Sequence, residues 1–197
     1  MIERMILDHG LDRRRVYISG LSAGGAMTSV MLAVYPELFA GGAILAGLPY
    51  RCAVDLPQAL RCMAEGQSRP STAWGDLARA ASPHRGPWPR VSVWHGAADT
   101  TVRPLNAEEI VKQWIDVHGL GPVPSVADTV HGCPNRVWRD AAGEEVIEAY
   151  LVPGMGHGVP VHPGGGDTEA RGGSTAPFML DVGIWSAWHI AGFWGLP

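Results

Sequence analysis

The spacing of apolar residues near the start of the chain predicts a strand followed by a helix. Apolar side chains alternate along residues 16–19, and a small-residue turn leads into an apolar helical pattern that ends at Tyr35, because Pro36 cannot continue it. Residues 39–47 then resume as a buried strand. Strand, helix and strand in this order form a parallel unit with a right-handed crossover, so the predicted fold class is α/β.

The remainder of the chain is less regular. Residues 48–89 combine prolines with short helical pieces, so we expect a loop-rich insertion over the sheet, and we expect residues 119–135 to form a polar connection. Other expected elements are a helix over 2–9 stopped by Gly10, a strand over 90–95, a helix from an Asn106 cap to His118, a hairpin of 137–139 with 146–152, a glycine-rich loop over 164–173 and a helix over 181–194.

The predicted strand, turn and helix carry a candidate nucleophile. Gly20-Leu21-Ser22-Ala23-Gly24 matches the G-x-S-x-G nucleophile elbow, in which glycines on both sides of the serine let strand and helix pack closely. A chance match is the alternative, because the chain contains 26 glycines. A strand before the motif and a helix after it are the context that the elbow requires. We therefore interpret Ser22 as the nucleophile and the backbone N–H of Ala23 as an oxyanion donor.

A serine nucleophile needs a base and an acid that orients the base. Asp99 follows the strand predicted over 90–95, and His157 lies between glycines after the next predicted strand. Ser22, Asp99 and His157 thus occur in the α/β-hydrolase order of serine, acid and histidine. An ordinary turn aspartate and a surface histidine are the alternatives, and Asp181 and Asp167 are the next acids by position.

Composition narrows the classes of function. The net charge is -4 and the 15 lysines and arginines form no long run, which disfavours binding to nucleic acid. The longest apolar runs are far shorter than the roughly 20 residues of a membrane span, and no export signal is visible at the N-terminus. Cys52 and Cys62 could bridge and leave Cys133 unpaired, and no histidine or cysteine spacing matches a known metal site. We expect no metal and no cofactor.

Four segments together resemble the polyhydroxybutyrate depolymerase-type esterases, relatives of feruloyl and acetylxylan esterases in the α/β-hydrolase superfamily. They are Arg-Val-Tyr-Ile-Ser-Gly-Leu-Ser-Ala-Gly-Gly-Ala-Met-Thr (15–28), Ala-Gly-Leu-Pro-Tyr (46–50), Val-Trp-His-Gly-Ala-Ala-Asp-Thr-Thr-Val (93–102) and Gly-Met-Gly-His-Gly (154–158). The resemblance extends over nearly the whole chain. It implies a single three-layer α/β-hydrolase-like domain over 1–197 with a mostly parallel sheet.

The resemblance also implies an activity. It places the catalytic triad of a serine carboxylesterase on Ser22, Asp99 and His157, with a hydroxyalkanoate polyester or oligomer as substrate and with secretion as the expected localisation. Feruloyl or acetyl esters of plant polysaccharide are the alternative substrates. Exposed aromatic residues of the insertion are candidates for a substrate cleft, although packing in the core is the commoner role of such residues. These candidates are Tyr50, Trp74 and Trp88.

One departure from the family affects the expected sheet. Family members are longer at the N-terminus, where the first strands of the sheet and a loop that supplies the second oxyanion donor precede the elbow. The strand from Val16 to Ser19 would then have an open edge, and such an edge is a site for self-association. A chain without these parts could be a weak esterase, or a non-catalytic remnant that acts as an interaction module.

Overall fold

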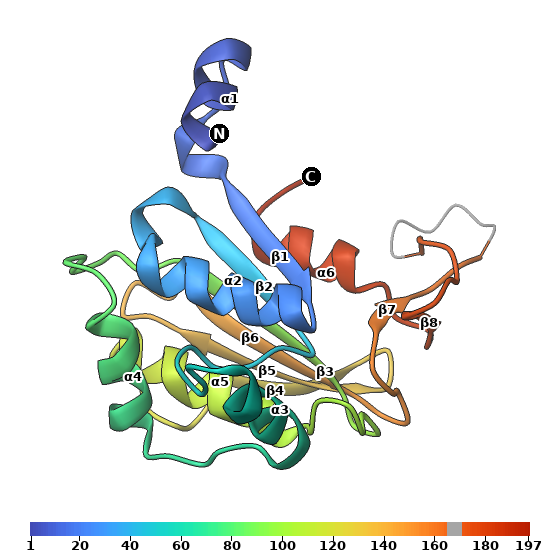
Figure 1. Ribbon diagram of the computed structural model, residues 1–197. Helices are drawn as coiled ribbons and strands as arrows, with labels where there is room; N and C mark the ends of the chain where they lie inside the picture. The colour runs from blue at the N-terminus through green and yellow to red at the C-terminus, as the bar shows by residue number, and fades with distance from the viewer. Residues whose placement is uncertain (165–170) are drawn as a thin grey trace.

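The computed structural model describes residues 1–164 and 171–197 and centres on a six-stranded sheet (Figure 1). The strand order is β1-β2-β3-β6-β5-β4. The first four strands in this order are parallel, whereas β5 and β4 join β6 through antiparallel pairings. Their bounds are Tyr17–Leu21 for β1, Gly41–Leu45 for β2, Arg90–Gly96 for β3, Val126–Val130 for β4, Cys133–Arg139 for β5 and Glu145–Val152 for β6. The predicted mostly parallel α/β sheet is therefore confirmed.

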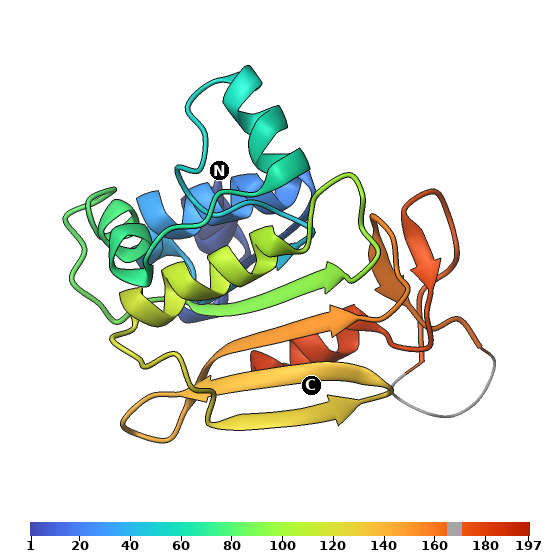
Figure 2. The same ribbon diagram turned by 90° about the horizontal axis from the view of Figure 1, so that it is seen from below.

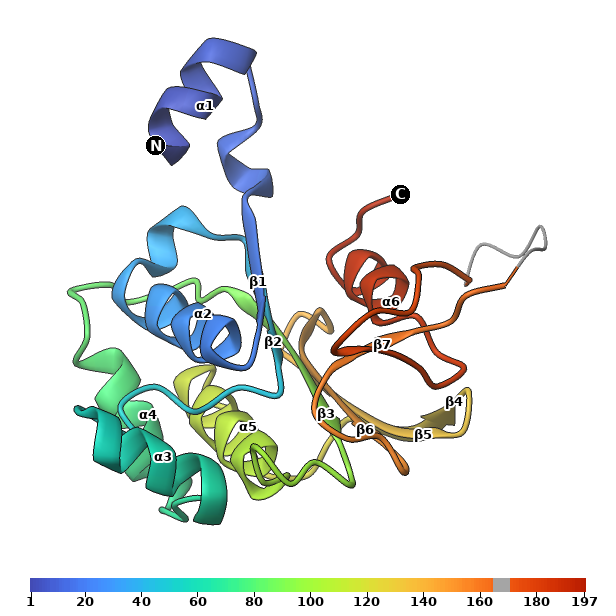
Figure 3. The ribbon, with the colours of Figure 1, turned by 45° about the vertical axis from the view of Figure 1, so that its right-hand side comes forward.

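Helices cover both faces of the sheet and produce three layers (Figure 3). Helices α2 (Ala23–Val34) and α5 (Leu105–Val117) pack on one face, and α6 (Ser186–Phe193) packs on the other. A short parallel pair, β7 (Val159–Val161) with β8 (Met179–Asp181), precedes α6. The helix α1 (Ile2–His9) ends at Gly10 in the left-handed conformation, as predicted from the position of this glycine.

The hydrophobic core is divided between the two faces of the sheet. Ile44, Ile147 and Trp114 belong to the cluster under α2 and α5, and each has no exposed surface. Trp94 and Tyr150 belong to the cluster under α6, where their rings stack at a centroid distance of 3.9 Å. Burial of each such side chain contributes about 1.5–3 kcal/mol.

The insertion after β2 is more helical than the sequence predicts. It contains α3 (Leu56–Glu65) and α4 (Ser71–Arg79), and these pack on α5 and α2 rather than directly over the sheet. The prediction of short helical pieces is confirmed, but the prediction that they cover the sheet is wrong. The reason is that α2 and α5 already occupy that face, so the insertion forms a further layer outside them.

Three further expectations are corrected by the structure. The segment 119–135 contains the edge strand β4, whose middle residues are exposed and therefore lack the apolar alternation of a buried strand. The last helix begins at Ser186 instead of 181, after Gly183 with a φ of 75°. The N-cap position of α5 is Pro104, and Asn106 is a buried residue of its first turn.

Part of the glycine-rich loop 164–173 lies outside the described residues. No helix among those described is long and apolar enough to cross a membrane.

Candidate functional site

Ser22 lies on a strained turn between β1 and α2. Its φ of 58° and ψ of -117° lie in a region that residues with a side chain rarely adopt. Two backbone hydrogen bonds hold it there: its N–H donates to the carbonyl of Leu45 at 2.9 Å, and its carbonyl accepts from the N–H of Ala26 at 2.9 Å. Such strain, on the order of 1–3 kcal/mol, persists where the surrounding structure fixes the residue, and it is often found at functional sites. The local geometry is that of a nucleophile elbow.

Two glycines allow β1 and α2 to approach closely at this turn. A Cβ at Gly20 would lie 2.3 Å from the backbone carbon and oxygen of Gly24, and a Cβ at Gly25 would lie 2.9 Å from the carbonyl oxygen of Leu45. A Cβ at Gly24 would meet no atom within 4 Å. The expectation that both motif glycines are needed for packing is therefore correct for Gly20 and wrong for Gly24, whose role is taken by Gly25.

Asp99 and His157 form a close pair. The Nδ1 atom of His157 lies 2.7 Å from Oδ2 of Asp99, and the Asp99 side chain has no exposed surface. The other carboxylate oxygen accepts hydrogen bonds from the backbone N–H groups of Thr101 at 2.8 Å and Val102 at 2.9 Å. The contact between the two side chains fixes which histidine nitrogen faces away from Asp99.

Close backbone contacts join the loops that carry these two residues. A Cβ at Gly96 would lie 2.3 Å from the carbonyl oxygen of Met155, so only glycine fits at the end of β3. The N–H of Ala98 donates to that same carbonyl at 2.9 Å, and the N–H of Ala97 donates to Val152 at 2.9 Å. Backbone hydrogen bonds between the two loops therefore hold Asp99 and His157 in position.

All three candidate residues follow the carboxyl ends of parallel strands. Ser22 follows β1, Asp99 follows β3 and His157 follows β6. All three therefore lie at the carboxyl ends of the parallel strands, the end of the sheet towards which β3 and β6 point in Figure 2. Val159, two residues after His157, lines an apolar pocket of about 250 Å³ together with Gly20 and Leu21. The loop after β6 therefore returns across the sheet to the end of β1, where Ser22 stands.

His95 supports the aspartate from the other side. It is fully buried in β3, and its Nε2 lies 2.7 Å from the carbonyl oxygen of Val102 and 3.5 Å from Oδ2 of Asp99. Burial lowers the pKa of His95, so its imidazole is neutral near pH 7. By donating to the carbonyl of Val102, the neutral imidazole stabilises the turn whose backbone N–H groups donate to Asp99. The structure thus places His95 within the strand, as the sequence predicts.

Phe178 is a neighbour of the site that sequence reasoning did not find. Its ring lies edge-on to that of His157 at a centroid distance of 6.2 Å, and the residue is 58% exposed. Its φ of 65° is unusual for a residue with a side chain, and its carbonyl accepts from the N–H of Val159 at 2.7 Å. No sequence pattern signals this contact, because 21 positions separate the two residues.

The three aromatic residues proposed for a substrate cleft differ in burial. Trp74 has no exposed surface and donates from Nε1 to Glu109 at 2.6 Å, so the expectation that it lines a cleft is wrong. Trp88 comes just before β3 and therefore lies at the amino end of this strand, whereas His157 follows the carboxyl end of β6. Tyr50 packs against the core under α2 and α5, and its backbone is bonded to Gln113. Tyr50 and Trp88 are half-buried and both pack against that core, so their proposed role in a substrate cleft stays a prediction.

The other candidate groups are placed as follows. Asp181, the alternative acid, lies in β8 with its Oδ1 3.8 Å from Nδ1 of His162, and Asp167 lies outside the described residues. Ala23 is the first residue of α2, where a helix leaves its N–H groups without an internal acceptor. Within residues 1–164 and 171–197, no three histidine, cysteine or acidic side chains are grouped to hold a metal ion.

The fold resembles solved structures of the α/β-hydrolase type. An acetyl xylan esterase from Aspergillus awamori superposes with a TM-score of 0.72 at 28% identity, covering 80% of this chain and 59% of that one. A PHB depolymerase solved in complex with an R3HB trimer superposes with a TM-score of 0.65 at 20% identity, covering 94% and 52%. The chain thus shares its overall fold with an acetyl xylan esterase and a PHB depolymerase.

Sequence comparison assigns the family. The profile of the Esterase PHB depolymerase family matches residues 1–128, and the chain belongs to this family. The chain is 45% identical to poly(3-hydroxyalkanoate) depolymerase C of Paucimonas lemoignei over 197 residues, which is all of this chain and 47% of that protein. It is 36% identical to an acetylxylan esterase of Coprinopsis cinerea over 76% of this chain and 41% of that protein. The chain thus spans about half the length of the curated relatives it matches.

Proposed function

We propose that the chain carries the catalytic residues of a serine carboxylic-ester hydrolase. The observation that carries this proposal is the 2.7 Å contact between His157 and Asp99, at the same sheet edge as the strained Ser22. Membership of the Esterase PHB depolymerase family supports the same chemistry. The proposed reaction needs no cofactor.

In this mechanism each residue has a defined role. Nε2 of His157 takes the proton of Ser22 Oγ while the oxygen attacks the ester carbonyl, and Asp99 stabilises the imidazolium that forms. The N–H of Ala23 donates to the oxyanion. His157 then passes its proton to the leaving alcohol, and a water molecule, activated by the same histidine, releases the acid from Ser22. Loss of a single oxyanion donor from such a site lowers the rate by about 10²–10³.

The proposed substrate is a hydroxyalkanoate polyester or its oligomers. The support is the relative of 45% identity, which is named as a depolymerase of such polymers. Acetylated or feruloylated polysaccharide is the alternative, because acetylxylan and feruloyl esterases are relatives at 36% and 33% identity. Incubation with poly(3-hydroxybutyrate) and with acetylated xylan, followed by analysis of released hydroxy acid and acetate, separates the two.

Active-site labelling tests the chemistry itself. We expect the chain to hydrolyse short p-nitrophenyl esters and to be labelled by an organophosphonate at Ser22, with both signals lost in Ser22→Ala. Ser19→Ala is the matched control, because Ser19 is an exposed serine of the adjacent strand. Equal labelling of wild type and Ser22→Ala would overturn the assignment of the nucleophile.

We propose in addition that the free edge of β1 pairs with another copy of the chain. Among the residues that the structure describes, β1 pairs only with β2. The carbonyl of Val16 and the N–H of Ser22 bond towards β2, so alternation points the backbone groups of Tyr17, Ser19 and Leu21 towards the open edge. A non-catalytic interaction module that uses this edge is the alternative function.

The edge proposal predicts a charge effect on the oligomeric state. We expect a concentration-dependent dimer that Ser19→Lys weakens, because the lysine places a desolvated charge at the paired edge. Thr129→Lys is the matched control, since Thr129 is an exposed residue of the opposite edge strand β4. A monomer at every concentration would contradict this proposal, and a folded dimer without serine labelling would favour the interaction module over the enzyme.

A further inference from the structure

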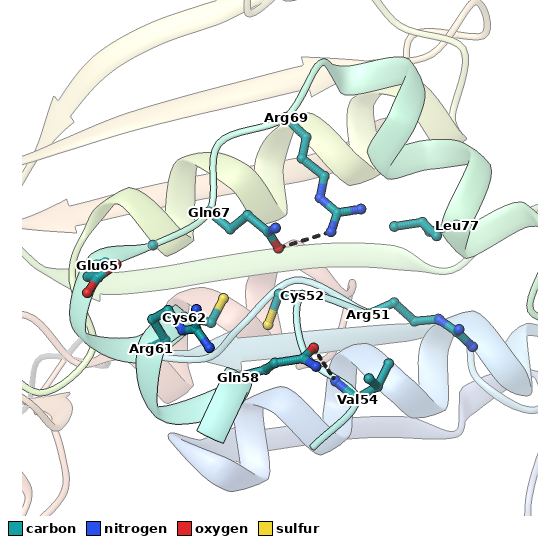
Figure 4. A pocket seen from close by; sticks show the side chains of 11 residues that line it. Arg51, Cys52, Val54, Gln58, Arg61, Cys62, Glu65, Gln67, Arg69 and Leu77 are labelled. Atoms are coloured by element: carbon teal, nitrogen blue, oxygen red, sulfur yellow. Dashed lines mark hydrogen bonds between the residues drawn. The ribbon is translucent and has the colours of Figure 1, made fainter. Parts of the chain in front are cut away.

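Two cysteines of the insertion face each other in the wall of one cavity. Cys52 lies in the segment between β2 and α3, and Cys62 lies in α3. Both line a cavity of about 640 Å³, and their sulfur atoms point towards one another (Figure 4). Both side chains also belong to the small hydrophobic cluster formed with Leu48, Trp74 and Val102. All three cysteines of the chain are free and buried in this structure.

The surroundings make the two thiols chemically unequal. Hydrogen bonding to Cys52 lowers the pKa of Cys62, whereas the same contact, together with burial, raises the pKa of Cys52. The guanidinium of Arg69 lowers the pKa of both thiols. Arg69 is itself fixed, with its guanidinium carbon 4.7 Å from the centroid of the Trp74 ring and Nη2 donating to Gln67 at 3.1 Å. Cys62 is therefore the thiol that ionises more readily and the better nucleophile.

We propose that Cys52 and Cys62 form an intramolecular disulfide that fastens α3 to the segment after β2. The facing sulfur atoms, their separation by ten positions in the sequence and the cavity that both line together carry this inference. It is independent of the proposed esterase activity. Cys133 takes no part, because it lies in β5 within the core under α6, on the other face of the sheet.

The oxidant is a small organic disulfide of the glutathione type, and the exchange is balanced. The Cys62 thiolate attacks one sulfur of this disulfide and releases the first small thiol, which leaves a mixed disulfide on Cys62. The Cys52 thiolate then attacks the Cys62 sulfur and releases the second small thiol. Two protein thiols are oxidised to one disulfide, the two electrons reduce the small disulfide, and the two protons go to the released thiols.

Hydrogen bonds connect this pair to the loop that carries Asp99. The carbonyl of Cys62 accepts from Nδ2 of Asn106 at 3.0 Å, and the Cys62 thiol donates to Oδ1 of the same side chain at 3.6 Å. The N–H of Arg103 donates to the carbonyl of Met63 at 2.9 Å. The end of α3 is thus docked on the segment that follows Asp99, so a bond between Cys52 and Cys62 stabilises α3 and this segment together.

Mass analysis of the wild-type chain tests the bond directly. After incubation with glutathione disulfide, we expect the intact mass to fall by about 2 Da, as loss of two hydrogens requires. We also expect alkylation of the denatured chain to label Cys133 alone, and proteolysis to yield a Cys52–Cys62 linked peptide. An unchanged mass, a glutathione adduct as the final product, or any bridge to Cys133 would overturn the proposal.

Thermal unfolding tests the fastening. The chain-entropy effect of closing this short loop predicts that the oxidised chain has a Tm higher by about 5–10 °C than the reduced chain. The difference is expected to disappear in Cys62→Ser and to persist in Cys133→Ser, which is the matched control. A linked peptide without any difference in Tm would show that the bond forms but does not fasten α3, and this part of the inference would then be wrong.

Discussion

Nδ1 of His157 lies 2.7 Å from Oδ2 of Asp99, although 58 positions of the chain separate the two residues. The contact leaves Nε2 as the nitrogen of His157 that does not face Asp99. It exists because the loops after β3 and β6 are joined through Gly96 and Met155. In the proposed mechanism Asp99 orients His157, so replacing Asp99 by a residue of the same shape is the most direct test of this role.

Asp99→Asn is expected to lower kcat by up to about 10⁴ with little change in KM, because the amide favours the wrong tautomer of His157. Hydrolysis of p-nitrophenyl esters and the rate of organophosphonate labelling should fall together. Asp181→Asn is the control, since Asp181 lies near His162 instead. An equal loss of activity in both variants, or a nearly active Asp99→Asn, would transfer the role of the acid away from Asp99.

The elbow provides a prediction about stability. Gly20→Ala places a Cβ 2.3 Å from the backbone of Gly24, which cannot yield without separating β1 from α2. We expect this variant to lose about 3 kcal/mol or more of stability, or to fail to fold. Gly24→Ala meets no atom within 4 Å and replaces a helical glycine, so it should be neutral or stabilising by up to about 1 kcal/mol. Urea unfolding of the two variants measures the difference, and equal midpoints would contradict the packing argument.

The elbow could be predicted from the sequence because its requirements are local. An apolar strand, glycines at fixed spacing and an apolar helix all occur within the first 34 residues, and the structure places β1 and α2 there. The order of Asp99 and His157 was also predictable. Their contact was not, because it requires the backbone of Gly96 to pass the carbonyl of Met155, and sequence patterns do not report such approaches.

Other features depend on tertiary packing and had no local signal. Trp74 resembles an exposed aromatic residue of a loop-rich segment, but α4 packs on α5 and brings its indole to Glu109 in the core. The strand β4 is polar because its middle residues face solvent, so alternation could not reveal it. Phe178 reaches His157 only through the pairing of β7 with β8, and this pairing joins segments on either side of the undescribed residues 165–170.

Phe178 is expected to contact the ester. Its positive φ costs about 1 kcal/mol of conformational free energy, and its ring lies beside His157. Because the ring is exposed, packing does not offset this cost, and we infer that the ring serves binding of the substrate. Phe178→Ala should raise KM for esters with long acyl chains several-fold and leave kcat for p-nitrophenyl acetate within about two-fold, as expected for a lost apolar contact. Phe178→Tyr keeps the aromatic face and should behave like wild type. Equal KM values for the three proteins would remove Phe178 from the substrate site.

Glu148 predicts a pH dependence of stability. It is buried in β6, where its Oε1 accepts from Oγ of Ser92 at 2.6 Å. The Oγ atom of Ser92 in turn accepts from Nε1 of Trp94 at 2.8 Å. Burial raises the pKa of Glu148 to about 8; the nearby Glu145 adds to the increase, and Ser92 and Arg90 oppose it. The folded chain therefore keeps this proton at pH 7, whereas the unfolded chain releases it above a pKa of about 4.5.

Because the folded state binds the proton more tightly, the free energy of unfolding falls as the pH rises from about 4.5 to 8. Glu148→Gln preserves the shape and removes the titration, so its stability relative to wild type should increase across this window, by up to about 4 kcal/mol between pH 5 and pH 8. Urea unfolding at the two pH values measures the change, and the pH 5 difference serves as the baseline for the substitution itself. A difference between variant and wild type that is the same at pH 5 and pH 8 would show that Glu148 is ionised in the folded chain.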